Sequence, residues 1–290
     1  MTCGNTIIMN EKRLDQQHWF LRLLFISVCL LSQIPAASAD LILSAPPRET
    51  PEAGKELYQP LADELTRLLG EKVVYERPSN WLVYQRDMRN DKYDIVFDGP
   101  HFISWRIKNH NHKAVVKLPG TLQFVIVAKA DDDKVKGLSD LVGRKICGIP
   151  PPNLGTLTVY AAFKHPARQP VVVPVRGSFT KVFKDFEAGK CEGAVFRTTF
   201  YAKKLTDEQR KTTKVLHRSD ALPNQGISIS SRVRPTARKL ILEALSKGDR
   251  IPATKNILAR FGGKAKAFEK ADDADYKDHH KLIEGVIFGW

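Results

Sequence analysis

The chain has 290 residues, and its 46 lysines and arginines outnumber its 32 aspartates and glutamates, which gives a net charge of +14. A surface of this sign attracts anions over long distances, but it does not distinguish small oxyanions from acidic lipids or polyanions. The four cysteines include no Cys-x-x-Cys motif, which argues against redox catalysis and cysteine-ligated zinc.

Residues 1–39 have the layout of a secretory signal peptide. A polar, mildly basic start precedes the apolar run Leu23–Leu31, and small residues end at Ala39. The run is about half of the ~20 residues that a membrane-spanning helix needs, so an uncleaved anchor is the weaker alternative. We expect cleavage after Ala39 and a mature protein in the periplasm.

The expected mature chain stays basic. Residues 1–39 hold three basic and two acidic residues, so 43 and 30 remain, a net charge of +13. Export argues against nucleic acid as a partner, and the chain lacks the aromatic-studded basic motif of RNA-binding modules.

The first part of the mature chain alternates short apolar strands with helices. Thr50 and Pro51 predict the start of an amphipathic helix. The predicted strands are Leu41–Ser44, Lys72–Glu76, Asp94–Phe97 and Ala114–Leu118, and the later helices are Trp81–Arg89 and His101–Lys108. Strands that alternate with helices indicate a mainly parallel sheet covered on both faces.

A second alternating series follows the β-rich run Gln123–Lys129. Its predicted strands are Lys145–Ile149, Val171–Val175, Gly193–Phe196 and Lys214–Leu216, and its predicted helices are Leu157–Phe163, Phe179–Phe186 and Phe200–Leu205. Gly226–Ser230 is another β segment, and helices dominate from Thr236 onward. Two such series predict two lobes around a cleft, joined by crossings at about Leu122 and Gln225.

The stretch Pro150–Pro152 predicts a rigid connector. Proline cannot donate to a strand ladder and cannot sit inside a helix, so a strand must end at about Ile149. Asn153 or Thr156 can accept hydrogen bonds from the first N–H groups of the next helix. In α/β proteins a strand, a turn and a helix start of this kind form a ligand-binding edge.

Only Cys147 and Cys191 remain after the expected cleavage. Two thiols in an oxidising compartment suggest one disulfide, although two buried free thiols are the alternative.

Six blocks in order resemble one known family: LYQPLADELTRLLGEKV, DGPHF, LSDLVGRKICG, FEAGKCEGAV, SDALPNQGISISSRVRP and ADYKDHHKLI. They are similar to the phosphate, phosphite and phosphonate-binding proteins of ABC importers, which are type II periplasmic binding proteins. The resemblance implies an α/β fold of two lobes, each a mainly parallel sheet flanked by helices, with two hinge crossovers. Residues 40–122 and 226–290 would form the first lobe and residues 123–225 the second.

The connector departs from that family. Phosphonate-binding relatives carry a Ser/Thr-rich turn there, of the form Asp-Pro-Ser-Ser-Thr-Ser-Gly, whereas Ile149–Gly155 reads Ile-Pro-Pro-Pro-Asn-Leu-Gly. A phosphonate would lose several charge-assisted hydrogen bonds, each contributing ~1.5–3 kcal/mol. This turn therefore favours another anion.

We predict ligand contacts at strand ends and helix starts that face the cleft. The predicted residues are Arg48, Trp81, Tyr84, His101, Asn153, Thr156, Ser178 and Arg197. The two aromatic rings can stack on a ligand, with core packing as the equal alternative, and His101 can donate to an anion or be structural. Arginines at strand ends, Arg176 among them, can bind an oxyanion or carboxylate through two parallel hydrogen bonds. The hydroxyl of Ser178 can bind a ligand or cap a helix.

Other chemistry has little support. His110 with His112, and His279 with His280, are spaced like weak metal ligands, but each pair lies in a hydrophilic run and is expected to be solvated. Nothing indicates catalysis, a cofactor or a metal. The prediction is an exported solute-binding protein that delivers a small anionic ligand, an oxyanion or carboxylate, to the permease of an ABC importer. The alternative is a periplasmic sensor or accessory protein that uses the same fold to engage a membrane partner.

Overall fold

The computed structural model describes residues 39–247 and 252–284. Asp40–Trp290 form one compact unit, which holds every helix and strand given below. The predicted signal peptide, apart from Ala39, lies outside the described residues. In the described part of the chain, no helix is both long enough and apolar enough to cross a bilayer.

One sheet has six strands in the order β13-β4-β12-β3-β1-β2. β1 is parallel to β2 and β3, whereas β12 is antiparallel to both β3 and β4, and β13 is antiparallel to β4. The strands are β1 (Leu41–Ser44), β2 (Val73–Tyr75), β3 (Ile95–Asp98), β4 (Lys113–Lys117), β12 (Gly226–Ile229) and β13 (Glu269–Lys270). Since β1 to β4 all point the same way, the first sheet is mainly parallel, as predicted.

The other large sheet has five strands in the order β10-β6-β9-β7-β8. β7 is parallel to β8 and β9, and β6 is antiparallel to β9 and β10. The strands are β6 (Phe124–Lys129), β7 (Lys145–Gly148), β8 (Val171–Pro174), β9 (Gly193–Arg197) and β10 (Thr213–Arg218). In each sheet, a strand next to a crossing runs against the parallel set: β6 where the chain enters, and β12 where it returns.

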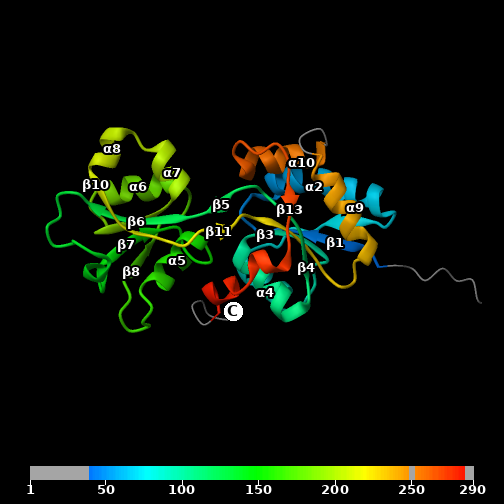
Figure 1. The fold of residues 1–290 in the computed structure, drawn as a ribbon, viewed down its shortest axis with the longest axis horizontal. Coiled ribbons are helices and arrows are strands. Elements are labelled where there is room, and N and C mark those ends of the chain that lie inside the picture. The colour runs from blue at the N-terminus through cyan, green and yellow to red at the C-terminus, as the bar shows by residue number, and fades with distance from the viewer. Residues whose placement is uncertain (1–38, 248–251, 285–290) are drawn as a thin grey trace, which may run out of the picture. The chain divides into compact units, whose positions relative to one another are not determined.

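A short antiparallel ribbon links the two sheets. β5 (Thr121–Leu122) pairs with β11 (Leu222–Pro223), with Leu122 opposite Leu222. The chain passes to the second sheet through β5 and returns through β11, close to the predicted crossings. The two sheets thus stay separate and are joined by two adjacent chain segments (Figure 1).

Helices cover both faces of each sheet. They are α2 (Pro51–Leu69), α3 (Trp81–Arg89), α4 (Pro100–His110), α5 (Leu154–Ala162), α6 (Phe179–Glu187), α7 (Thr198–Lys204), α8 (Asp207–Lys211), α9 (Pro235–Leu245) and α10 (Pro252–Ile257). Shorter turns of helix cover Leu138–Leu141, Leu258–Gly262, Asp273–Tyr276 and His279–Leu282. Figure 1 shows α2 and α10 above the first sheet and α4 below it.

Local signals explain most helix starts. The Thr50 side chain accepts from the N–H of Ala53 and Pro51 follows at the first helical position, as predicted for α2. α5 begins at Leu154 rather than at Leu157, because Asn153 caps it by accepting from the N–H of Gly155. α8 was not predicted, since its signal is only a five-residue polar segment with a capping box from Thr206.

The alternation of side chains along each central strand builds a core on both faces. In β3, Ile95 and Phe97 join the cluster under α2, α9 and α10, whereas Val96 joins the cluster under α3 and α4. In β6, Val125 and Val127 pack under α6 and α7, whereas Phe124 and Ile126 pack against α5. This burial on both faces is typical of mainly parallel sheets.

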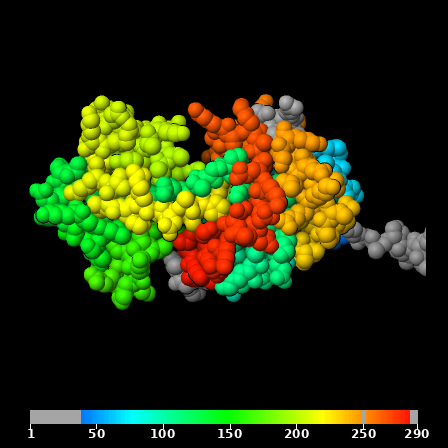
Figure 2. All heavy atoms as spheres, viewed as in Figure 1, coloured from blue at the N-terminus to red at the C-terminus, as the bar shows by residue number. Residues whose placement is uncertain are grey.

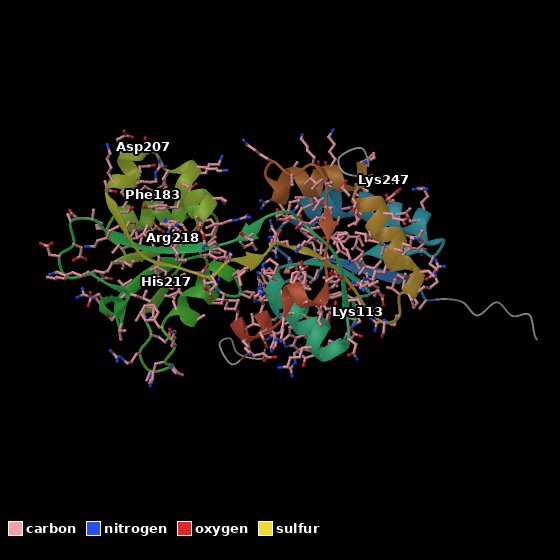
Figure 3. All side chains as sticks on the ribbon, in the orientation of Figure 1. Lys113, Phe183, Asp207, His217, Arg218 and Lys247 are labelled. Carbon is pink, nitrogen blue, oxygen red and sulfur yellow. A yellow bond between two sulfur atoms is a disulfide. The ribbon has the colours of Figure 1, made fainter. Side chains whose placement is uncertain are left out.

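The apolar stripe of α6 is core, as predicted. Val182, Phe183 and Phe186 are buried in the cluster that contains Cys147 and Cys191. Figure 3 contrasts Phe183 with Asp207, whose side chain is 75% exposed at the start of α8.

Cys147 in β7 and Cys191 just before β9 form the predicted disulfide. Both residues are buried, and the bond joins two adjacent parallel strands of the second sheet. The alternative of two free thiols is therefore excluded.

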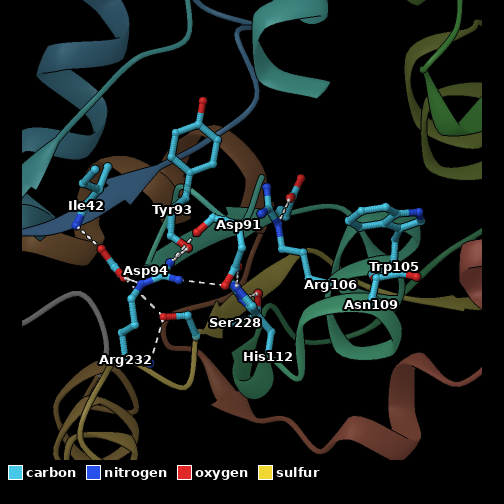
Figure 4. Close-up of polar contacts among 12 residues, drawn as sticks. Ile42, Asp91, Tyr93, Asp94, Trp105, Arg106, Asn109, His112, Ser228 and Arg232 are labelled. Atoms are coloured by element: carbon cyan, nitrogen blue, oxygen red, sulfur yellow. Dashed lines mark hydrogen bonds and ion pairs between the residues drawn. The ribbon is translucent and has the colours of Figure 1, made fainter. Parts of the chain in front are cut away.

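A polar network ties the start of β3 to the end of β12 (Figure 4). Arg232 forms ion pairs with Asp91 and Asp94, at 2.7 and 2.5 Å. His112 lies 3.0 Å from the Asp91 carboxylate and 3.4 Å from the Ser228 hydroxyl. His112 was expected to be solvated but is fully buried, because it lies just before β4 inside this network. Among the described residues, no cluster of His, Cys, Asp or Glu could hold a metal ion.

Candidate ligand-binding site

A cavity of about 680 Å³ lies between the carboxyl ends of strands from both large sheets. The surface in Figure 2 is hollowed between the yellow-green helices α6 and α7 and the orange segment around α10. The lining residues are Pro47, Arg48, Trp81, Gly99, Pro100, His101, Phe102, Leu122, Phe124, Ile149, Pro150, Pro151, Pro152, Asn153, Leu154, Arg176, Gly177, Phe179, Arg197, Gln225, Arg260 and Phe261. The volume is typical of a site for a small organic molecule.

The first sheet contributes His101 and Arg48 to the wall. His101 is only 3% exposed at the start of α4, and neither ring nitrogen has a hydrogen-bond partner among the described residues. Burial and the nearby positive charge of Arg48 lower the pKa of His101 to about 3. The nearby Pro152 carbonyl raises the pKa of His101 and so opposes this shift, although it forms no hydrogen bond of normal geometry with the imidazole ring. His101 is therefore neutral at physiological pH and can donate one hydrogen bond.

A buried carboxylate supports this wall from below. Asp98, the last residue of β3, is fully buried and accepts from the N–H of Gly99 and from the hydroxyl of Tyr84. Its ion-pair partner is the fully buried Arg106, whose Nε lies 3.4 Å from the Asp98 carboxylate. These contacts hold the start of α4, and with it His101, at the edge of the sheet.

The second sheet contributes the proline connector. Pro150–Pro152 follow β7 and line the cavity, with Asn153 and Leu154 directly behind them. Thr156 holds the connector in place, because its hydroxyl donates to the Ile149 carbonyl at 2.6 Å. The predicted strand, stiff turn and helix start are all present, and the turn faces the cavity, but the helix start is not exposed, because Leu154, Gly155 and Thr156 are buried.

Among the described residues, four arginines line the cavity, and no aspartate, glutamate, serine or threonine does. Arg260 pairs with Glu49 at 3.0 Å. Arg48, Arg176 and Arg197 form no ion pair with a described carboxylate. The lining thus carries a net positive charge.

Two of these arginines also have buried donors without a partner in the described residues. They are Nη1 of Arg48 and Nε of Arg197, and burial lowers the pKa of Arg197. A buried N–H donor without an acceptor costs free energy, so each of these two donors favours a ligand that supplies a hydrogen-bond acceptor.

Aromatic rings form much of the remaining wall. The ring of Trp81 stacks on Phe102, with centroids 6.2 Å apart, and Phe261 lies under two guanidinium groups. These belong to Arg48 and Arg260, whose central carbons are 5.9 and 5.0 Å from the Phe261 ring centroid.

Five of the predicted contact residues lie in the cavity wall, namely Arg48, Trp81, His101, Asn153 and Arg197. Three others do not. Tyr84 is fully buried and donates its hydroxyl to Asp98, and Thr156 is fully buried with its hydroxyl directed at the backbone. The Ser178 side chain caps α6 by accepting a hydrogen bond from the N–H of Lys181, which is the alternative role considered for this residue.

Sequence reasoning missed the contribution of the later chain. Gln225, Arg260 and Phe261 line the cavity although they are more than 170 residues from Arg48 in the sequence. Gln225 lies at the predicted return crossing, and this position could have identified it as a cavity residue. The sequence gives no such indication for Arg260 and Phe261, because they lie in a helical turn rather than at a strand end or a helix cap.

Comparisons with known proteins agree with this architecture. The family described as "ABC transporter, phosphonate, periplasmic substrate-binding protein" matches residues 43–276. The phosphate-import protein PhnD of Mycolicibacterium smegmatis is 29% identical over 121 residues, a match that covers 38% of this chain and 37% of that protein. The match therefore spans little more than a third of that relative's length.

Two solved structures have the same fold. XAC2383 from Xanthomonas citri, bound to ATP, has a TM-score of 0.66 and 12% identity over 84% of this chain and 96% of its own. PhnD1 from Prochlorococcus marinus, in complex with methylphosphonate, has a TM-score of 0.61 and 14% identity over 83% and 96%. Such neighbours are type II periplasmic binding proteins, and at this low identity they establish the fold of this chain but not its ligand.

Members of the matching family are substrate-binding proteins of transport systems rather than enzymes. Their family implies a small-molecule ligand and a membrane permease as partner. Because the match extends over most of the chain, from β1 to the turn that ends at Tyr276, this chain belongs to the periplasmic substrate-binding proteins of the phosphonate ABC transporter family.

Proposed function

We propose that this protein is an exported receptor that captures a small anionic ligand between its two sheets and delivers it to an ABC importer. The observation that carries the proposal is the charge of the cavity wall. Arg48, Arg176 and Arg197 face one cavity without an ion-pair partner in the described part of the chain, where buried donors on two of them also find no acceptor. An anion supplies both the charge and the acceptors.

The ligands named for similar proteins support an anion. ATP in the Xanthomonas citri structure, methylphosphonate in the Prochlorococcus marinus structure and phosphate for the Mycolicibacterium smegmatis relative are all phosphorus oxyanions. In this chain the lining offers guanidinium and imidazole groups in place of hydroxyls. Guanidinium forks suit carboxylates as well as phosphorus oxyanions, so the proposed class is an oxyanion or a carboxylate.

The proposed mechanism is closure about the β5 and β11 ribbon. The proposed lobes are residues 40–122 with 226–290, and residues 123–225. Each contributes one wall: Arg48, Trp81 and His101 on one side, and Asn153 and Arg197 on the other. Hinge closure around a ligand that contacts both walls is the usual behaviour of such receptors.

The proposed location is the periplasm. Its support is the family match together with the signal-like composition of residues 1–39, with cleavage after Ala39. Removal of that segment leaves a mature chain that contains every residue of the cavity wall.

Titration calorimetry with mature protein, residues 40–290, tests the proposal. The probes are inorganic phosphate, methylphosphonate, sulfate, succinate and citrate, with lysine and glucose as cationic and neutral controls. We expect anions to bind, and Arg197→Ala and Arg48→Ala each to weaken binding about 10- to 100-fold through the loss of a charge-assisted hydrogen bond.

Arg218→Ala is the matched control, because Arg218 is exposed in β10 and does not line the cavity. Small-angle scattering with and without the best anion reports on closure. If no anion in the panel binds, or if Arg218→Ala weakens binding as much as Arg197→Ala, the proposed site is wrong.

A further inference from the structure

We infer that the ligand is an aromatic polyanion: a planar ring that carries at least two negative charges. This inference rests on the proposed function and narrows the ligand class of the same cavity. Three properties of the wall lead to it, namely its charge, its exposed rings and its size.

The charge of the cavity wall favours a ligand with more than one anionic group. Three arginines, Arg48, Arg176 and Arg197, line the cavity without a carboxylate among the described residues, and the lining itself contains no acidic side chain. A singly charged ligand would pair with only part of this charge, because Arg48 and Arg197 each hold a buried donor without an acceptor among the described residues, and Arg176 adds a solvent-exposed charge. Arg48 comes from the loop after β1, whereas Arg176 and Arg197 follow β8 and end β9, so the positive charge is divided between opposite walls.

The rings of Trp81, Phe179 and Phe261 are only half-buried, and they lie in the wall of the cavity. Trp81 is the first residue of α3, Phe179 is the first residue of α6, and Phe261 belongs to the turn Leu258–Gly262. Three separate elements therefore each place an aromatic ring at the cavity. An inorganic anion or a methyl-bearing acid covers little of such a surface. A flat ring can stack on it, and Phe261 already lies beneath the Arg48 guanidinium, which places a cation and a ring side by side.

The size of the cavity exceeds what a small oxyanion needs. Its volume of about 680 Å³ equals the liquid volume of about twenty water molecules. The walls already meet along one side, so this is not the volume of two widely separated lobes. Leu157 and Tyr160 of α5 pack with Phe102 and Trp105 of α4, and the Pro152 carbonyl acts on the His101 ring.

Matched ligand pairs test the inference by titration calorimetry on the mature protein. Phenylphosphonate and methylphosphonate share a head group and differ by the ring, whereas phthalate and benzoate share the ring and differ by one charge. We expect phenylphosphonate to bind at least about tenfold more tightly than methylphosphonate, and phthalate at least about tenfold more tightly than benzoate.

The variant Trp81→Leu should weaken the binding of phenylphosphonate more than that of methylphosphonate, and so reduce the ratio of the two affinities. Arg197→Ala should weaken both by the same factor. The matched aromatic control is Phe163→Leu, because Phe163 is half-buried at the end of α5 and lies outside the cavity wall. It should leave both affinities unchanged.

The outcomes separate this inference from the proposed function. If methylphosphonate binds as tightly as phenylphosphonate, or if succinate, an aliphatic dicarboxylate, binds as tightly as the aromatic dicarboxylate phthalate, the ring is not recognised, and the inference is overturned while the proposed function stands. If benzoate matches phthalate, the requirement for two charges is overturned. If none of these anions binds, both proposals fail together.

Discussion

Two buried histidines make the stability of this protein depend on pH in a way that can be calculated. The pKa of His101 and the pKa of His112 are each lowered from 6.5 to about 3. Burial is the main cause for both, helped by the positive charge of Arg48 near His101 and of Arg106 near His112. The hydrogen bond from His112 to Asp91 opposes the shift without cancelling it.

The sign follows from the lowered pKa values. In the unfolded chain each histidine binds a proton as the pH falls through about 6.5, whereas the folded protein binds it only near pH 3. The contribution of these two histidines to the free energy of unfolding is therefore present above pH 6.5 and is lost progressively as the pH falls from 6.5 to 3. From pH 7 to pH 5, each histidine should lower the free energy of unfolding by about 2 kcal/mol, and the pair by about 4 kcal/mol.

This magnitude does not depend on the exact folded pKa, since any value below about 4 leaves the folded histidine neutral at pH 5. Urea denaturation of the mature protein at pH 7, 6 and 5 measures it. We expect His101→Asn and His112→Asn each to reduce the loss between pH 7 and pH 5 by about 2 kcal/mol relative to the parent protein. His165→Asn is the control, because His165 is exposed. Equal pH dependence in the parent protein and in His101→Asn would refute the reasoning for that residue.

Three further predictions concern stability. Reduction of the Cys147–Cys191 disulfide, which spans 44 residues, should cost about 4 kcal/mol and lower Tm by roughly 8–16 °C in calorimetry with and without a reductant; an unchanged Tm after verified reduction would contradict the loop-entropy estimate. Asp98→Asn should cost about 3–5 kcal/mol in urea denaturation, because it leaves the charge of fully buried Arg106 without its partner; a cost below about 1 kcal/mol would mean that Arg106 finds compensation elsewhere. Asn153→Ala should cost about 1 kcal/mol through loss of the α5 cap, measured in the same assay, and a neutral effect would show that the cap is replaceable.

The proline connector shows how far local sequence can predict a site. Pro150–Pro152 cannot continue β7 or enter α5, so their chemistry alone requires a stiff turn between the two. Asn153 then caps the helix, as its side chain favours. Both effects act within a few residues, and for that reason the turn and its place at the cavity edge were predictable.

Trp81 and Tyr84 show where such prediction stops. They are one helical turn apart in α3, and either ring could have faced the ligand. Asp98 distinguishes the two rings, because its buried carboxylate accepts a hydrogen bond from the Tyr84 hydroxyl and the Tyr84 ring is therefore buried in the core. Trp81 is left at the cavity wall.

The sequence by itself determined the two β/α series, the crossings between them and the positive charge, because periodicity, turn chemistry and composition act locally or are simple sums. Only the tertiary structure decided that Arg260 and Phe261 meet Arg48 at one cavity, and that Thr156 and Tyr84 direct their hydroxyls elsewhere. The direction of a side chain and the partners left to it depend on elements far apart in the chain, which become neighbours only when the sheets and helices pack.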